Sequence, residues 1–379
     1  MKRAVAAGQT ATLVELMLGA RAGDIRVVDH AASRLTSRAA PAELRAAVLL
    51  AQAGAHFWDG THDDVQSLLN QALAQAQRCG LSGVQADVLA MMACIDSYRG
   101  RPGHADDAVL RAHCLLRGQP SLRPPAALQL AAVIRSIQKA DFLAAERTLC
   151  SVSLSAAVGA DPWLGGVLTL WRATLLTLSG KPQEARVLLG TTTADPPPAL
   201  LQLHRDVLFG EIEMLRGRPQ DALRRFGRHR KGSLAALVDL PCARAYLALG
   251  DLDSARHRIR RMLATRPQLS RYLFVDSMLL DARIAERTGD TGRALDVITN
   301  ALDVAHEEIV LPFVRAREEF SDLLARHPAV ADRWPGPPAS PLGGVATALA
   351  EQGLPGRSRP AHAPGADRPC LPGHQPDGG

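Results

Sequence analysis

Apolar positions recur in a fixed register relative to short turns along most of the chain. Turns such as LSGKPQEARVLL and LRGRPQDALRRF place a small or apolar residue five positions after the turn residue, and another apolar residue four positions later. The turn residues are Gly23, Gly60, Gly100, Ala140, Gly180, Gly217, Gly250 and Gly289; the residues five positions later are Val28, Val65, Ala105, Ala145, Ala185, Ala222, Ala255 and Ala294; those four beyond are Ala32, Leu69, Val109, Leu149, Leu189, Phe226, Ile259 and Ile298. Positions 23 to 289 span 266 residues in seven intervals, so the mean period is 38, with steps of 33 to 40.

This register predicts helical hairpins. A glycine after a periodic run provides the left-handed C-terminal cap of one helix. A second helix then begins at a proline or an aspartate, since proline lacks an N–H that is unpaired there anyway and aspartate caps exposed N–H groups. The starting residues of this kind are Pro102, Pro182, Pro219, Asp24, Asp251 and Asp290. No hairpin buries its apolar face alone, so we expect an all-α solenoid of about eight stacked hairpins over residues 1–334.

The C-terminal end of the chain departs from this pattern. The stretch from Ile309 to Pro335, IVLPFVRAREEFSDLLARHPAVADRWP, predicts one more amphipathic helix that covers the end of the stack. Of residues 335–379, 19 are Pro or Gly, a composition that predicts a disordered tail.

The hairpin register resembles the tetratricopeptide repeat, which has Gly and Ala at the same offset. It departs from that family in its period and in lacking regular Trp and Tyr anchors, of which Tyr246 is the clearest. The segment Leu279–Trp334 is similar to the end of the helical-repeat region of large LuxR-type, MalT-like transcriptional regulators, where a V-x-P-F helix precedes a DNA-binding helix-turn-helix. Those regulators carry an ATPase with a P-loop, and no G-x-x-x-x-G-K-[ST] pattern is present here.

The tail is where that resemblance would place the helix-turn-helix. Codons for Pro360–Gly379, read from the second base with one synonymous choice, give PLTHRELTVLAFLATSLTA, the expected opening of a LuxR-type helix-turn-helix. We therefore hypothesise that a one-nucleotide frameshift upstream of Pro360 has replaced the DNA-binding domain. The alternative is a native disordered tail. In either case we expect no sequence-specific DNA binding by this chain.

Two basic runs are the candidate partner-binding residues. RRFGRHRK and RHRIRR fall on the second helices of consecutive hairpins, and their candidate residues are Arg224, Arg225, Arg228, Arg258, Arg260 and Arg261. A basic stripe there could meet nucleic acid, an acidic partner or a phosphorylated ligand. The alternative is a solvated outer face, because charge alone gives only non-specific attraction. Trp171 and Arg172 are further candidates, for the lining of a concave groove.

Other chemistry finds little support in the sequence. The 12 histidines and six cysteines show no metal-ligand spacing, and no Ser/His/Asp or Cys/His set can be assembled, so we expect no enzyme, metal or cofactor. No apolar run approaches the roughly 20 residues of a membrane-spanning helix, and scattered cysteines favour the cytoplasm. The net charge of +6 permits but does not demand an acidic partner.

Two functions remain open from the sequence. The resemblance implies the non-catalytic sensor or protein-interaction arm of a LuxR-type regulator, with a protein or small-molecule effector on the solenoid surface. The alternative is a free-standing scaffold that binds other proteins and never belonged to a transcription factor.

Overall fold

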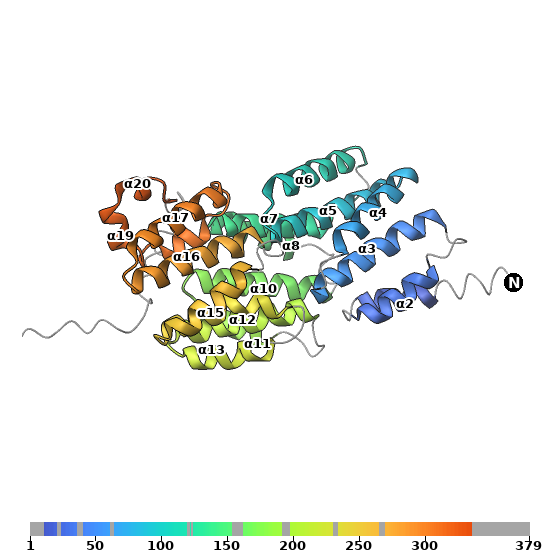
Figure 1. Ribbon diagram of the computed structural model, residues 1–379. Helices are drawn as coiled ribbons and strands as arrows, with labels where there is room; N and C mark the ends of the chain where they lie inside the picture. The colour runs from blue at the N-terminus through green and yellow to red at the C-terminus, as the bar shows by residue number, and fades with distance from the viewer. Residues whose placement is uncertain are drawn as a thin grey trace, which may run out of the picture.

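The computed structural model describes residues 11–20, 24–35, 41–60, 64–119, 122, 124–153, 162–191, 198–229, 234–264 and 270–335. Within these ranges all regular structure is helical and no strand occurs. The helices pair in chain order as residues 11–20 with α2 (Ile25–Leu35), α3 (Ala42–Asp59) with α4 (Val65–Arg78), α5 (Ser82–Tyr98) with α6 (Pro102–Arg117), α7 (Ala126–Gln138) with α8 (Phe142–Ser153), α10 (Pro162–Leu178) with α11 (Pro182–Gly190), α12 (Ala199–Leu215) with α13 (Pro219–Phe226), α14 (Asp239–Ala248) with α15 (Leu252–Ala264), and α16 (Arg271–Arg287) with α17 (Thr291–Ala305). The all-α, helical-repeat prediction is confirmed (Figure 1).

The predicted turn residues are the points where first helices end. All of those described have left-handed backbone, with φ between +59° and +83°, namely Gly60, Gly100, Ala140, Gly180, Gly217, Gly250 and Gly289. Gly23 lies outside the described residues. Glycine adopts this conformation without a steric penalty, so the local sequence sets where each hairpin turns.

The two anchor positions of each second helix form the hairpin interior. All eight residues five positions after the turn residue are 0% exposed, from Val28 to Ala294. The residues four positions further on are also buried, except that Val109 is only partly so. The starts of the second helices agree with the prediction as well. Proline occupies the first turn of α6, α11 and α13, and the carboxylates of Asp24, Asp251 and Asp290 accept backbone N–H groups.

The end of the stack is covered by three short helices, so the prediction of one amphipathic helix from Ile309 is wrong. They are α18 (Leu311–Ala316), α19 (Ser321–Arg326) and α20 (Pro328–Ala331). A turn separates the first two, and Pro328 prevents α19 from continuing because the residue before a proline disfavours helical backbone. The breaks let Trp334 fold back, so that its ring lies 5.2 Å from Phe313 and its Nε1 donates to the Phe313 carbonyl at 3.2 Å. The tail and frameshift predictions fall on residues 336–379, outside the described residues.

Early hairpins also contact late ones, along a line that we call the seam. A Cβ on Gly60 would lie 2.2 Å from Leu234 Cδ2, and one on Gly100 would lie 2.9 Å from Arg271 Cβ. The next contact of the seam is made by the turn after α7, where the amide of Val310 donates to the carbonyl of Gln138 at 2.8 Å. The paired positions 60/234, 100/271 and 138/310 are 174, 171 and 172 residues apart, so the seam follows the repeat register.

The first helices of the hairpins form an inner layer that the seam closes. Helix α3 contacts α12, and Leu311 on α18 joins the apolar core cluster built from α3 to α12. A solenoid in which each repeat contacts only its neighbours remains a prediction, because here distant hairpins also touch. In Figure 1 the C-terminal helices α16 and α17 accordingly lie beside α7.

Candidate binding surface

Two of the predicted basic residues lie against a buried carboxylate. Arg225 on α13 and Arg228 just after it approach Asp206 on α12, with nitrogen–oxygen distances of 3.8 and 3.9 Å. His229 Nε2 lies 2.7 Å from the other oxygen of the same carboxylate. Because an unpaired buried charge is strongly destabilising, these basic groups stabilise the α12–α13 hairpin.

The next hairpin repeats this arrangement. Arg258 on α15 donates to Asp239 on α14 at 2.9 Å, and Arg261 lies 3.5 Å from the second oxygen. Asp239 is 1% exposed. The ion-paired arginines of the two hairpins are separated by the same 33 residues as the turns at Gly217 and Gly250. The two basic runs are therefore one repeated hairpin contact.

The other two predicted arginines have no buried partner. Arg224 pairs with Asp221 within α13 and stays largely exposed. Arg260 is exposed and makes no ion pair with the described part of the chain. With two arginines for each buried carboxylate, the outer surface of these hairpins keeps a positive excess that attracts anions weakly. Binding of a specific partner by this surface stays a prediction.

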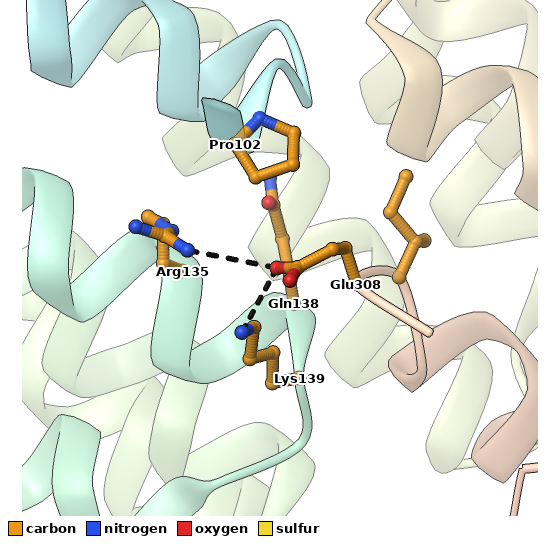
Figure 2. A pocket seen from close by; sticks show the side chains of 6 residues that line it. Pro102, Arg135, Gln138, Lys139 and Glu308 are labelled. Atoms are coloured by element: carbon orange, nitrogen blue, oxygen red, sulfur yellow. Dashed lines mark ion pairs between the residues drawn. The ribbon is translucent and has the colours of Figure 1, made fainter. Parts of the chain in front are cut away.

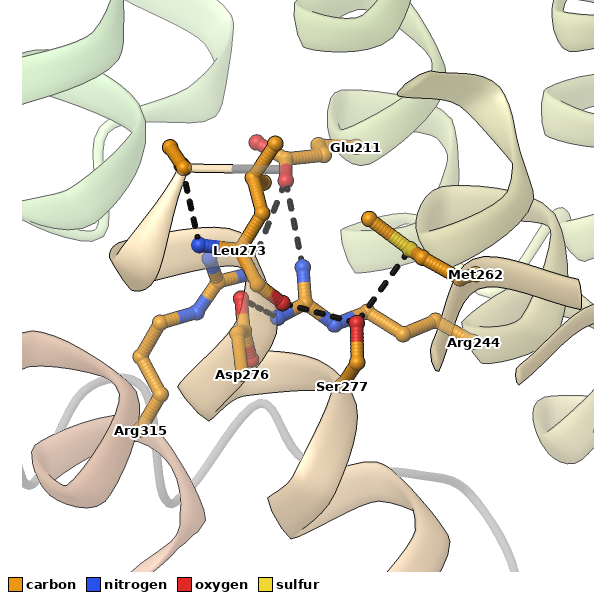
Figure 3. A network of polar contacts seen from close by, with 8 residues as sticks. Glu211, Arg244, Met262, Leu273, Asp276, Ser277 and Arg315 are labelled. Atoms are coloured by element: carbon orange, nitrogen blue, oxygen red, sulfur yellow. Dashed lines mark hydrogen bonds and ion pairs between the residues drawn. The ribbon is translucent and has the colours of Figure 1, made fainter. Parts of the chain in front are cut away.

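A second polar cluster, not predicted from the sequence, lies between the first helices of the last hairpins. Figure 3 shows Arg244 on α14 and Arg315 on α18 both approaching Glu211 on α12, at 3.6 and 3.7 Å. Arg244 also pairs with Asp276 on α16. Two arginines and two carboxylates thus connect four helices from separate hairpins, with their charges balanced.

Burial strengthens the coupling within this cluster. Burial alone would lower the pKa of Arg315, but Glu211, Tyr272 and Asp276 together raise it above its ordinary value. Burial, with the nearby Asp276 charge, raises the pKa of Tyr272 to about 12. Arg315 therefore stays charged and Tyr272 stays neutral at physiological pH. Because no proton transfer is favoured between them, the cluster is suited to holding helices together, and we find no acid–base pair in it.

Aromatic rings fill the inner layer further toward the N-terminal end. The ring of Tyr98 lies 5.5 Å from Phe57 and 5.6 Å from Trp171, and Trp171 lies 5.3 Å from His204. Trp171 is buried, so it packs in this column and does not line an open groove; Arg172 beside it is exposed. Burial lowers the pKa of His204 to about 4, which keeps the imidazole neutral.

A small pocket lies at the seam. Its lining is Pro102, Arg135, Gln138, Lys139, Glu308 and Ile309, and Figure 2 shows Glu308 between Arg135 and Lys139. The pocket has about 190 Å³ of empty space, less than the roughly 300–1,000 Å³ of typical ligand sites. Its cations are already paired with Glu308, so in this conformation it has little capacity for an organic ligand.

Searches for other kinds of site give no candidates. Among the described residues, no group of three or more His, Cys, Asp or Glu side chains is arranged to hold a metal ion. None of the helices in the described ranges has the length and apolarity needed to cross a membrane. A comparison with protein-family models found no match, and a search of the curated proteins also found none.

Proposed function

We propose that this chain is the non-catalytic sensor or protein-interaction arm of a LuxR-type, MalT-like transcriptional regulator, without sequence-specific DNA binding of its own. The observation that carries the proposal is the fold of Leu279–Trp334, the segment with the resemblance. It contains the end of α16, all of α17 and the three short helices that cover the stack. A DNA-binding domain that followed this segment would leave the stack directly after its covered end.

The hairpin stack suits an arm that responds to partners and has no chemistry of its own. Stacked hairpins present a long surface made by many elements, and a ligand that prefers one arrangement of them biases the whole assembly. In this structure the inner layer is filled by rings and by the Glu211–Arg244–Asp276–Arg315 cluster. An effector or partner would therefore bind the outer surface, or bind after the hairpins rearrange.

The proposal is tested at the DNA level. The nucleotide sequence should contain a helix-turn-helix in the second-base frame upstream of and through Pro360–Gly379. A gene repaired by one nucleotide should then produce a protein that selects a specific duplex from a random-sequence pool at physiological salt. The chain as it stands should select none, which is the matched control.

Two results would contradict the proposal. Sequence-specific binding by the unrepaired chain would show that DNA recognition resides in the helical repeats. A shifted frame without a helix-turn-helix, together with a neighbouring gene context that lacks an ATPase, would favour the free-standing protein-binding scaffold.

A further inference from the structure

The contact of the seam at the turn after α7 is built mainly from polar groups. Glu308 lies 2.9 Å from Lys139 Nζ and 3.5 Å from Arg135 (Figure 2), and the Val310 amide donates to the Gln138 carbonyl. All three charged side chains are partly exposed. Because partly exposed ion pairs contribute little to stability, this contact is the one that opens most easily.

The two earlier contacts of the seam are more apolar. At Gly60, the buried side chain of Leu234 packs directly on the glycine backbone. At Gly100, the amide of Arg271 donates to the carbonyl of Arg99 at 2.9 Å, beside Tyr272, which packs against the main apolar core. Opening from the C-terminal side therefore disturbs the least apolar surface.

The segment that closes this contact has unusual backbone. His306 and Glu307 have φ of +48° and +56°, two consecutive left-handed residues of which neither is glycine. Such backbone is unfavourable for residues with a Cβ and persists only where surrounding contacts hold it. Here those contacts are the ones made by Glu308 and Val310 directly after the strained residues.

The elements on either side of the segment have separate cores. Leu311 belongs to the cluster formed by α3 to α12, whereas Phe313 and Trp334 belong to the cluster formed by α16 to α20. Arg315 remains attached to Glu211. Withdrawal of Glu308–Leu311 would therefore leave both cores folded.

We propose that residues His306–Leu311 form a strained latch. When closed, the latch holds the C-terminal unit against α7 through Glu308 and Val310. When open, it relaxes the backbone at His306 and Glu307 and frees Arg135 and Lys139 for an acidic partner. This inference does not rest on the proposed function, because it concerns contacts within the described chain only.

Hydrogen exchange of the full chain tests the latch, with the Val310 amide as the reporter. Glu308→Lys should speed exchange of the peptide that contains Val310 at least about tenfold, since two attractive pairs become repulsive. Exchange at Arg271 and the global unfolding midpoint should stay unchanged. The double variant Lys139→Glu with Glu308→Lys should recover most of the protection.

A second pair of variants tests the strain. Glu307→Asn should slow exchange at Val310, because asparagine tolerates left-handed backbone. Glu307→Gln removes the same charge without that tolerance and should leave exchange near the wild-type rate. The latch is refuted if Val310 exchanges only by global unfolding, or if the Asn and Gln variants behave alike.

Discussion

The guanidinium of Arg258 donates to the carboxylate of Asp239 at 2.9 Å, across a hairpin whose interior this carboxylate shares with apolar side chains. Removing the arginine leaves Asp239 with Arg261 alone, at 3.5 Å. Breaking a buried pair in this way costs about 3 kcal/mol of unfolding free energy. We expect Arg258→Met to lower the urea midpoint by a corresponding amount. Arg260→Met, two positions further on an exposed site, is the matched control and should change stability by less than about 0.5 kcal/mol. Equal effects of the two variants would contradict the pairing.

The glycine turns should differ in their tolerance of alanine. Gly217 and Gly60 both have left-handed backbone, but a Cβ on Gly217 meets nothing within 4 Å, whereas one on Gly60 would clash with Leu234. Gly217→Ala should therefore cost about 1–2 kcal/mol from backbone alone. Gly60→Ala should cost a further 1–3 kcal/mol, about the usual cost of overpacking. Thermal or urea unfolding measures both. Gly60→Ala should be partly rescued by Leu234→Ala, and an absence of rescue would argue against the contact.

His204 should make stability depend on pH. Its pKa is lowered by burial to about 4, while the unfolded imidazole titrates near 6.5. Between these values the unfolded state binds the extra proton, so stability falls as the pH drops from 6.5 toward 4. Relative to His204→Phe, the wild type should lose about 2 kcal/mol between pH 7 and pH 4.5. The exposed His257→Phe variant should show the same pH dependence as the wild type. Urea unfolding at the two pH values gives the difference, and parallel curves for wild type and His204→Phe would refute a neutral buried His204.

Trp334 should hold the covering helices in place. Its ring contacts Phe313 and Phe320, and its indole donates to a backbone carbonyl. Trp334→Ala should cost about 3–5 kcal/mol, the usual range for deleting a buried aromatic side chain. Protease digestion should then cleave first between α18 and α20. Arg333→Ala, which removes a half-exposed neighbour, should leave the digestion pattern unchanged.

The sequence predicted the hairpins well because their determinants are local. Left-handed turns at Gly60 and Gly289, and buried anchors such as Ala222, follow from residues within one turn of each other. The covering segment was predicted less well, since its apolar period continues through the turn before Ser321 although the backbone does not.

The contacts between distant hairpins could not be predicted. Gly60 meets Leu234 because of the way successive hairpins are rotated, and no local pattern records that rotation. The basic runs were placed correctly on second helices, but their acidic partners were missed. A signal existed in the sequence, because Asp206 and Asp239 each lie 19 residues before an arginine that they bind.

The near-equal spacing across the seam fixes how many hairpins this molecule can have. In an open repeat array, loss or duplication of one unit merely changes the length. Here, deletion of a unit between Gly100 and Arg271 would shift each partner by a whole period, and Gly60, Gly100 and Gln138 would all face the wrong residues. The seam thus makes the arm behave like a ring with a set circumference, in which evolution can vary the surface far more freely than the repeat number.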